Sequence, residues 1–118
     1  MHTAVQRYLK GLDEGNLAEI LDLFSADATV VSPIYGKRAA RDFYQVLFDD
    51  TSSSNTSLLR TVIDEQEGTM VLIFSYQWKL KDHRFLDFEV ADFIQFDENG
   101  LIKQLSIFYD TFPLRGNS

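Results

Sequence analysis

The stretch QRYLKGLDEGNLAEILDLFSADATVVSP, residues 6–33, decides how the chain begins to fold. Its apolar residues, with those just before it, recur at helical spacing over residues 3–14 and again over residues 17–24. Gly15, between the two patterns, predicts a left-handed end to the first helix. The apolar residues at 28–32 then predict a short strand. Two helices leading into a strand are therefore expected at the N-terminus.

The rest of the chain changes from a helical to a strand-like pattern. A third helix is expected at residues 37–48, and the polar run DDTSSSNTS that follows it, residues 49–57, predicts a solvated loop. Four strands are expected after the loop, at residues 58–65, 70–80, 85–96 and 101–112. Short turns between successive strands predict an antiparallel meander. Three helices and a curved antiparallel sheet make an α+β fold that can enclose a cavity.

Composition restricts the classes of function. The 118 residues are expected to form one domain, 1–118, because typical domains hold about 100–150 residues. The net charge of −7 disfavours nucleic acid and anionic membranes as partners. No apolar run approaches the roughly 20 residues of a membrane span, and no signal-peptide pattern opens the chain. A cytoplasmic protein is therefore expected.

Cysteine and histidine, two common metal-binding residue types, are absent or scarce in this sequence. Cysteine is absent, which excludes disulfides and thiolate metal sites. The two histidines, His2 and His83, have no neighbouring ligand at metal spacing. We expect neither a metal site nor a cofactor.

The predicted strand at residues 85–96 carries an acid on its apolar side. Alternate residues of a strand point to the same side, and one side here reads Leu86, Phe88, Val90, Asp92, Ile94 and Phe96. An ionised carboxylate among apolar side chains costs several kcal/mol. Asp92 must therefore find a partner, reach water or keep its proton with a raised pKa. It is either a hydrogen-bond donor in a cavity or a group bonded to local backbone or to buried water.

Tyr8 lies on the apolar side of the first predicted helix. A tyrosine in such a position is usually a core residue whose hydroxyl is satisfied at the rim. In combination with Asp92, however, Tyr8 supplies a second neutral donor. Two neutral donors that converge in a dry cavity can stabilise a developing oxyanion.

Aromatic side chains also alternate along the predicted strand at residues 70–80, where Phe74, Tyr76 and Trp78 share one side. Packing in the core or on the sheet face explains this pattern. A second explanation is a pocket wall or a dimer interface, because so apolar a face exceeds what a monomer usually exposes.

These residues lie in segments that resemble bacterial ketosteroid isomerases. VQRYLKGLDEGNLAEILDLFSADATVVSP is similar to the opening of those enzymes, RDFYQVLF to their third helix, and ADFIQFDENG to the strand that carries their oxyanion-hole acid. The wider group is the nuclear transport factor 2-like superfamily, which includes SnoaL-like polyketide cyclases. The resemblance implies a conical fold, with three helices on a strongly curved, mainly antiparallel sheet around a deep apolar pocket. It also implies a hydrophobic small-molecule ligand and a homodimer packed through the sheet.

The resemblance assigns roles to particular residues. Tyr8 matches the oxyanion-hole tyrosine, and Asp92 matches the acid that stays protonated beside it, a known property of ketosteroid isomerases. Tyr44 matches a tyrosine of the third helix that hydrogen-bonds the first tyrosine. Phe88 and Val90, on the side of the strand that carries Asp92, are expected to bind substrate together with Tyr44.

The match breaks at Ser32. In the isomerases, the residue before the proline that ends the first strand is the aspartate that moves the proton. A serine hydroxyl is a very poor general base without an activating partner. Ser32 is therefore expected to contact substrate without replacing that base.

Three functions remain open. The first is an isomerase, cyclase or dehydratase that polarises a carbonyl or enol oxygen, with a base such as Asp110 or Asp27 supplied from elsewhere. The second is a module that binds a phenolic or enolic ligand without turnover. The third is a dimerising scaffold with a vestigial pocket. Asp110 and Asp27 are themselves more typical of surface or capping residues, and His83 of a solvated turn.

Overall fold

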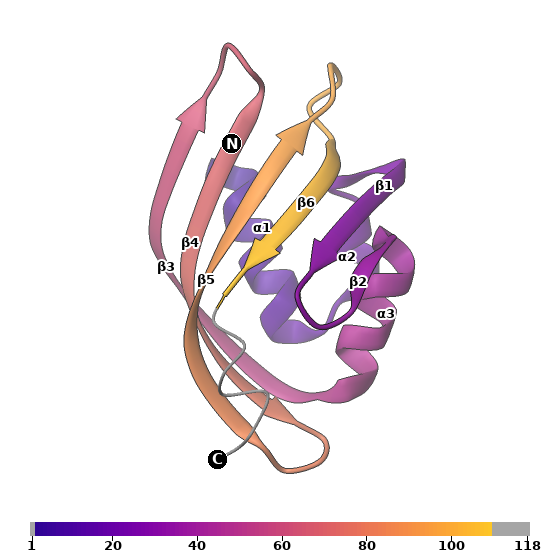
Figure 1. Cartoon of the computed structure of the whole chain (residues 1–118), viewed down its shortest axis with the longest axis vertical. Coiled ribbons are helices and arrows are strands. Elements are labelled where there is room, and N and C mark those ends of the chain that lie inside the picture. Colours follow the sequence, from indigo (N-terminus) through magenta and orange to yellow (C-terminus); the bar gives the residue numbers. More distant parts are fainter. Residues whose placement is uncertain (1, 110–118) are drawn as a thin grey trace.

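The computed structural model describes residues 2–109, in which three helices pack on a six-stranded sheet (Figure 1). In chain order the elements are α1 (His2–Glu14), α2 (Leu17–Leu21), β1 (Phe24–Ser32), β2 (Gly36–Ala39), α3 (Ala40–Asp50), β3 (Thr51–Asp64), β4 (Thr69–Leu80), β5 (Phe85–Phe96) and β6 (Ile102–Phe108). The predicted α+β class is confirmed, with the helices in the first half of the chain.

The strands form one curved sheet in the order β2-β1-β6-β5-β4-β3. Strands β3 to β6 pair antiparallel with their neighbours in sequence, which confirms the predicted meander. Strand β1 pairs antiparallel with β2 and parallel with β6, so the described sheet is mainly antiparallel. The helices cover one face of the sheet, and Figure 1 looks onto the other.

The prediction of a loop at residues 49–57 is wrong, because α3 runs to Asp50 and β3 begins directly after it. The polar side chains of this part of β3 bind the C-terminal turn of α1. Ser54 Oγ donates to the carbonyl oxygen of Leu12 at 3.1 Å. The backbone N–H of Thr56 donates to the Asp13 carboxylate at 2.9 Å. The strand is thus tied to the end of α1 by side-chain and backbone hydrogen bonds.

Three predicted boundaries also shift. The third helix begins at Ala40 rather than at residue 37, because residues 36–39 form β2 and pair with the end of β1. Strand β1 begins at Phe24, so this buried residue belongs to the strand and not to the second helix. The predicted strand at residues 101–112 begins at Ile102, and its predicted end lies outside the described residues.

The side-chain pattern of the two central strands agrees with the sequence. In β4 every second residue from Met70 to Leu80 is buried. In β5 the predicted apolar side is buried or half-buried, and the other side is exposed or half-buried. The buried sides face the helices and form the core with them. Within residues 2–109, no helix is long and apolar enough to cross a membrane.

Candidate functional site

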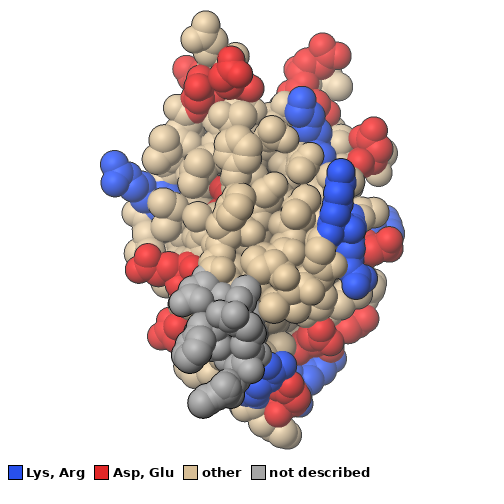
Figure 2. All heavy atoms as spheres, viewed as in Figure 1, with Lys and Arg blue, Asp and Glu red and all other residues tan. Residues whose placement is uncertain are grey.

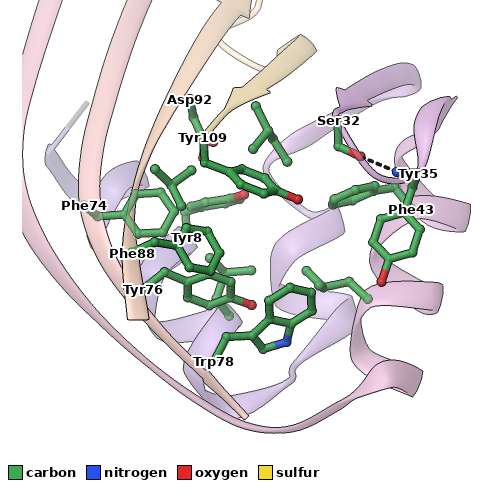
Figure 3. A pocket seen from close by; sticks show the side chains of 14 residues that line it. Tyr8, Ser32, Tyr35, Phe43, Phe74, Tyr76, Trp78, Phe88, Asp92 and Tyr109 are labelled. Carbon is green, nitrogen blue, oxygen red and sulfur yellow. Dashed lines mark hydrogen bonds between the residues drawn. The ribbon is translucent and has the colours of Figure 1, made fainter. Parts of the chain in front are cut away.

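A narrow cavity of about 40 Å³ lies between the helices and the inner face of the sheet (Figure 3). Its walls come from α1, α3, the end of β1, β4, β5 and the end of β6. The lining residues are Tyr8, Leu12, Ser32, Tyr35, Phe43, Leu47, Phe74, Tyr76, Trp78, Phe88, Val90, Asp92, Ile107 and Tyr109. Eight of these fourteen residues are aromatic. Such a lining suits a flat apolar ligand.

Asp92 lies in the centre of the sheet and points into this apolar space (Figure 3). Its neighbours across the strands are Leu72 in β4 and Ile107 in β6. The residue is 1% exposed, and neither carboxyl oxygen has a hydrogen-bond partner in the described part of the chain. Asp92 therefore does not bond to local backbone, which was one of the explanations considered for its position on the apolar side.

Burial raises the pKa of Asp92 from its ordinary value to about 8. The nearby Tyr8 side chain lowers this pKa by a smaller amount, although its hydroxyl is not in hydrogen-bonding geometry with the carboxyl group. At neutral pH Asp92 is accordingly a neutral acid with a proton to donate.

Tyr8 brings a second hydroxyl to the cavity from α1. Its hydroxyl oxygen lies 2.7 Å from that of Tyr44 in α3, which is the hydrogen bond that the resemblance implies. Tyr44 itself is fully buried behind Tyr8 and does not line the cavity. Its ring packs edge-on against Phe43, with centroids 4.8 Å apart. Burial raises the pKa of both tyrosines well above the ordinary value, so both keep their protons.

Ser32 ends β1 at the edge of the cavity, where it is 6% exposed. Its Oγ accepts a hydrogen bond from the backbone N–H of Tyr35 at 3.0 Å. This bond closes the turn between β1 and β2, a turn in which Pro33 has no N–H of its own to offer. The Ser32 hydroxyl proton therefore stays available for a ligand, while no described group activates the oxygen as a base.

Neither Asp27 nor His83 lines the cavity. Asp27 is exposed and accepts a hydrogen bond from the Ser25 hydroxyl at 3.2 Å, and it does not line the cavity. Asp110 lies outside the described residues. His83 is exposed in the turn between β4 and β5, with a φ of 77°. No cluster of three or more metal-ligand side chains occurs in residues 2–109.

The cavity contains residues that the sequence interpretation did not assign to a site. Phe74, Tyr76 and Trp78 belong to the buried core and also line the cavity, so the core explanation and the pocket-wall explanation of the alternating aromatic residues both apply. Tyr35 and Tyr109 were not predicted at all. For Tyr109 a signal existed, because Leu105, Ile107 and Tyr109 alternate in the same way as the inner residues of β5. Phe88 and Val90 line the cavity beside Asp92.

Comparison with known proteins gives a family match and a set of similar structures. The model of the SnoaL-like domain matches residues 5–105. No curated protein sequence matches the chain. A nuclear transport factor 2-like protein of unknown function from Exiguobacterium sp. 255-15 has a TM-score of 0.75 at 19% identity, covering 91% of this chain and 98% of that one.

Two similar structures are those of enzymes. The BvnE pinacolase from Penicillium brevicompactum has a TM-score of 0.79 at 14% identity, over 96% of this chain and 84% of the other. SalBIII, an epoxide hydrolase/cyclase-like enzyme with a role in pyran ring formation in salinomycin, has a TM-score of 0.78 at 12% identity, over 92% and 89%. At such identities the likeness establishes the fold alone, which is the nuclear transport factor 2-like fold.

Proposed function

The chain belongs to the SnoaL-like domain family, and from this premise we propose that it acts on a hydrophobic small molecule by polarising a carbonyl or enol oxygen. Tyr8 and Asp92 are the two donors to that oxygen. The observation that supports this most directly is the buried carboxyl group of Asp92, which faces an aromatic cavity without a partner of its own. An unsatisfied buried polar group is costly and calls for an explanation; a ligand oxygen supplies one.

The chemistry follows from the protonation states of the two donors. A neutral carboxylic acid and a neutral phenol can each donate a hydrogen bond to a ligand oxygen as it gains negative charge. In a dry site such donors stabilise the charge more than water does, because they are already oriented. Tyr44 acts through Tyr8, since the bond between their hydroxyls fixes the Tyr8 phenol in place. Tyr44 is thus a positioning residue.

The missing base indicates which reactions suit the site. A serine such as Ser32 removes a proton from carbon poorly, whereas protonated Asp92 can give a proton or hydrogen bond to oxygen. Isomerisations, cyclisations and dehydrations that begin at an oxygen atom therefore suit this cavity better than those that begin at a C–H bond. The pinacolase and the epoxide hydrolase/cyclase-like enzyme are named for reactions of oxygen functions, which supports this class.

A second candidate function is ligand binding without turnover. Ser32 favours it, because its oxygen is already used by the Tyr35 N–H and the cavity offers no other base among the described residues. Tyr8 and Asp92 would then hold a phenol or enol at equilibrium. Both functions require the same donors, so one binding experiment tests their common basis.

Binding of an aromatic ketone is expected to depend on the proton of Asp92. Calorimetry with acetylnaphthalene from pH 5 to 9 should give constant affinity up to about pH 7 and then a loss that approaches tenfold per pH unit above the Asp92 pKa of about 8. In Asp92→Asn the affinity should be lower at pH 6 and should no longer change with pH. A ketone accepts hydrogen bonds without donating them, so an ionised Asp92 cannot bind it.

Asp27→Asn is the matched control for this experiment, because it removes an exposed carboxylate outside the cavity. This variant should bind the ketone as the wild type does at every pH. Absence of binding to the wild type, or the same pH profile in the wild type and in Asp92→Asn, would contradict the proposed donor pair.

We also propose that two copies of the chain pair through the outward face of the sheet. This face carries Val71 and Ile73 in β4, Ala91 and Phe93 in β5, and Phe108 in β6, which are neighbours in the strand register. Figure 2 shows its middle largely free of charged side chains, which gather around the edge. Contiguous apolar residues on an outward sheet face often mark a protein–protein interface.

Phe93→Lys is expected to convert the dimer to a monomer, because a buried ammonium group would lie in the apolar interface. Sedimentation velocity at micromolar concentration measures the change. Ile34→Lys, at an exposed apolar residue in the turn between β1 and β2, serves as the control and should stay dimeric. A wild type that sediments as a monomer across the concentration range would refute the pairing.

A further inference from the structure

The cavity beside Asp92 is smaller than the ligand that the proposed function requires. Its volume is about 40 Å³, whereas pockets for drug-sized molecules hold about 300–1,000 Å³. Even an engineered cavity that binds benzene holds about 150 Å³. An aromatic ketone therefore does not fit the cavity in this conformation, and part of the wall must move before it binds.

A larger open groove adjoins the cavity. It has a volume of about 500 Å³ and lies between the turn that joins β1 to β2, the end of α3 and the turn that joins β4 to β5. Its walls combine apolar side chains such as Ile34 and Leu80 with the carboxylate of Asp50. Among the described residues, the side chains that line both the cavity and the groove are Tyr35 and Trp78. These two residues therefore separate the two spaces.

Trp78 is the fixed part of this boundary. It lies in β4, which pairs with a strand on each side, and it is 4% exposed. Its indole N–H donates to the Thr51 hydroxyl at 2.8 Å, and its ring stacks on Tyr76 with 5.5 Å between centroids. Movement of Trp78 would break these contacts within the sheet.

Tyr35 is the part of the boundary that can move. It lies in the turn between β1 and β2, outside the strand pairing of the sheet. Its backbone N–H donates to Ser32 Oγ at 3.0 Å, and its carbonyl oxygen accepts from Arg38 Nε at 3.0 Å. These two bonds hold the backbone, so the side chain can turn while the backbone stays in place.

Three contacts hold the Tyr35 side chain in its present position. Its ring packs edge-on against Phe43, with centroids 5.7 Å apart, and lies beside it in Figure 3. The Arg38 guanidinium group lies 5.8 Å from the ring centroid. The hydroxyl donates to the Asp50 carboxylate at 2.7 Å. A hydrogen bond fixes direction as well as distance, and this one is exposed to solvent, so water can replace it when the ring turns.

We propose that Tyr35 is the gate of the cavity and that its hydrogen bond to Asp50 keeps the gate closed. When this bond breaks and the ring turns away, the cavity joins the groove and a ligand can enter. The ligand then occupies space that the ring has left, because the closed cavity is too small for it. The gate therefore stays open while the ligand is bound. The inference rests on the proposed function for the kind of ligand that enters.

Removal of the bond between Tyr35 and Asp50 is expected to tighten ligand binding, because a larger fraction of the free protein is then open. Calorimetry with acetylnaphthalene at pH 6 should give about two- to tenfold higher affinity for Tyr35→Phe and for Asp50→Ala than for the wild type. The double variant should bind no more tightly than the better single variant, because each substitution removes the same bond. Asp49→Ala is the matched control, since it removes the neighbouring exposed carboxylate of α3, which bonds to Gln45. This variant should bind as the wild type does.

Acrylamide quenching of Trp78 fluorescence tests the motion without a ligand. Trp78 is the single tryptophan of the sequence, and it lines both spaces together with Tyr35, so opening of the gate exposes its ring. The bimolecular quenching constant should rise about twofold or more in Tyr35→Phe and in Asp50→Ala. In Asp49→Ala it should keep the wild-type value.

The two measurements separate this inference from the function on which it rests. If the quenching constant rises in both variants but acetylnaphthalene does not bind the wild type, the gate stands and the proposed function fails. If binding depends on Asp92 but Tyr35→Phe and Asp50→Ala change neither quenching nor affinity, the gate is wrong and the donor pair stands. Weaker binding to Tyr35→Phe would also overturn the gate, because the Tyr35 hydroxyl would then be a contact of the ligand.

Discussion

Asp92→Asn is expected to stabilise the folded protein by about 4 kcal/mol at pH 7. The carboxyl group has a pKa of about 8 when folded, against an ordinary value of 3.8. Between these two pH values the unfolded chain releases a proton that the folded protein keeps, so wild-type stability falls as the pH rises. Below the lower pKa both states are protonated and Asp92 has no such effect. Asparagine has no proton to release, so the free energy of unfolding of the variant does not fall with pH for this reason.

Urea denaturation of both proteins from pH 4 to 9 measures this effect. The difference in unfolding free energy between Asp92→Asn and the wild type should grow by about 1.4 kcal/mol per pH unit and level off above the folded pKa. Asp27→Asn, which removes an exposed carboxylate, should show no such growth. A difference that does not change with pH would mean that Asp92 is ionised in the folded protein.

A carboxyl group that weakens the fold at neutral pH is not explained by the needs of the fold. Leu72 and Ile107, its neighbours across the strands, show that an apolar side chain suits this part of the sheet. Substitutions that improve stability at the expense of activity are typical of functional sites. The stability measurement therefore bears on function, because a stabilised variant that has lost ligand binding identifies Asp92 as a residue of the site.

Backbone periodicity explains why part of the site could be predicted from sequence. Alternation along β5 is sufficient to place Asp92 on the apolar side, since successive side chains of a strand point to opposite faces. Helical spacing places Tyr8 on the inner side of α1 in the same way. Neither pattern shows that the two side chains share one cavity, and that relation came from the resemblance to the isomerases.

The errors come from interactions between elements that are distant in the sequence. Residues 49–57 have the composition of a loop, yet the first two end α3 and residues 51–57 form a strand, because β4 pairs with them and because Ser54 and Thr56 bind the end of α1. Local sequence patterns contain no information on such tertiary partners.

Ser32→Asp is expected to raise the turnover of a β,γ-unsaturated cyclic ketone by about 10²- to 10⁴-fold over the wild type. The substitution places a carboxylate at the end of β1, where the Tyr35 N–H that now binds the serine oxygen can hold it. A carboxylate can take the proton next to the carbonyl group, which a serine hydroxyl cannot do at neutral pH. Tyr8 and Asp92 would stabilise the enolate that results.

Two further variants show which groups cause the increase in turnover of Ser32→Asp. Ser32→Asn has nearly the same shape without a base and should gain nothing. Adding Asp92→Asn to Ser32→Asp should remove most of the gain, because the base needs a stabilised oxyanion to act efficiently. If Ser32→Asp folds and binds the ketone but turns over no faster, the donors are not placed for this reaction. If the wild type already isomerises the ketone rapidly, a base other than residue 32 is present, and the preference for reactions that begin at oxygen is wrong.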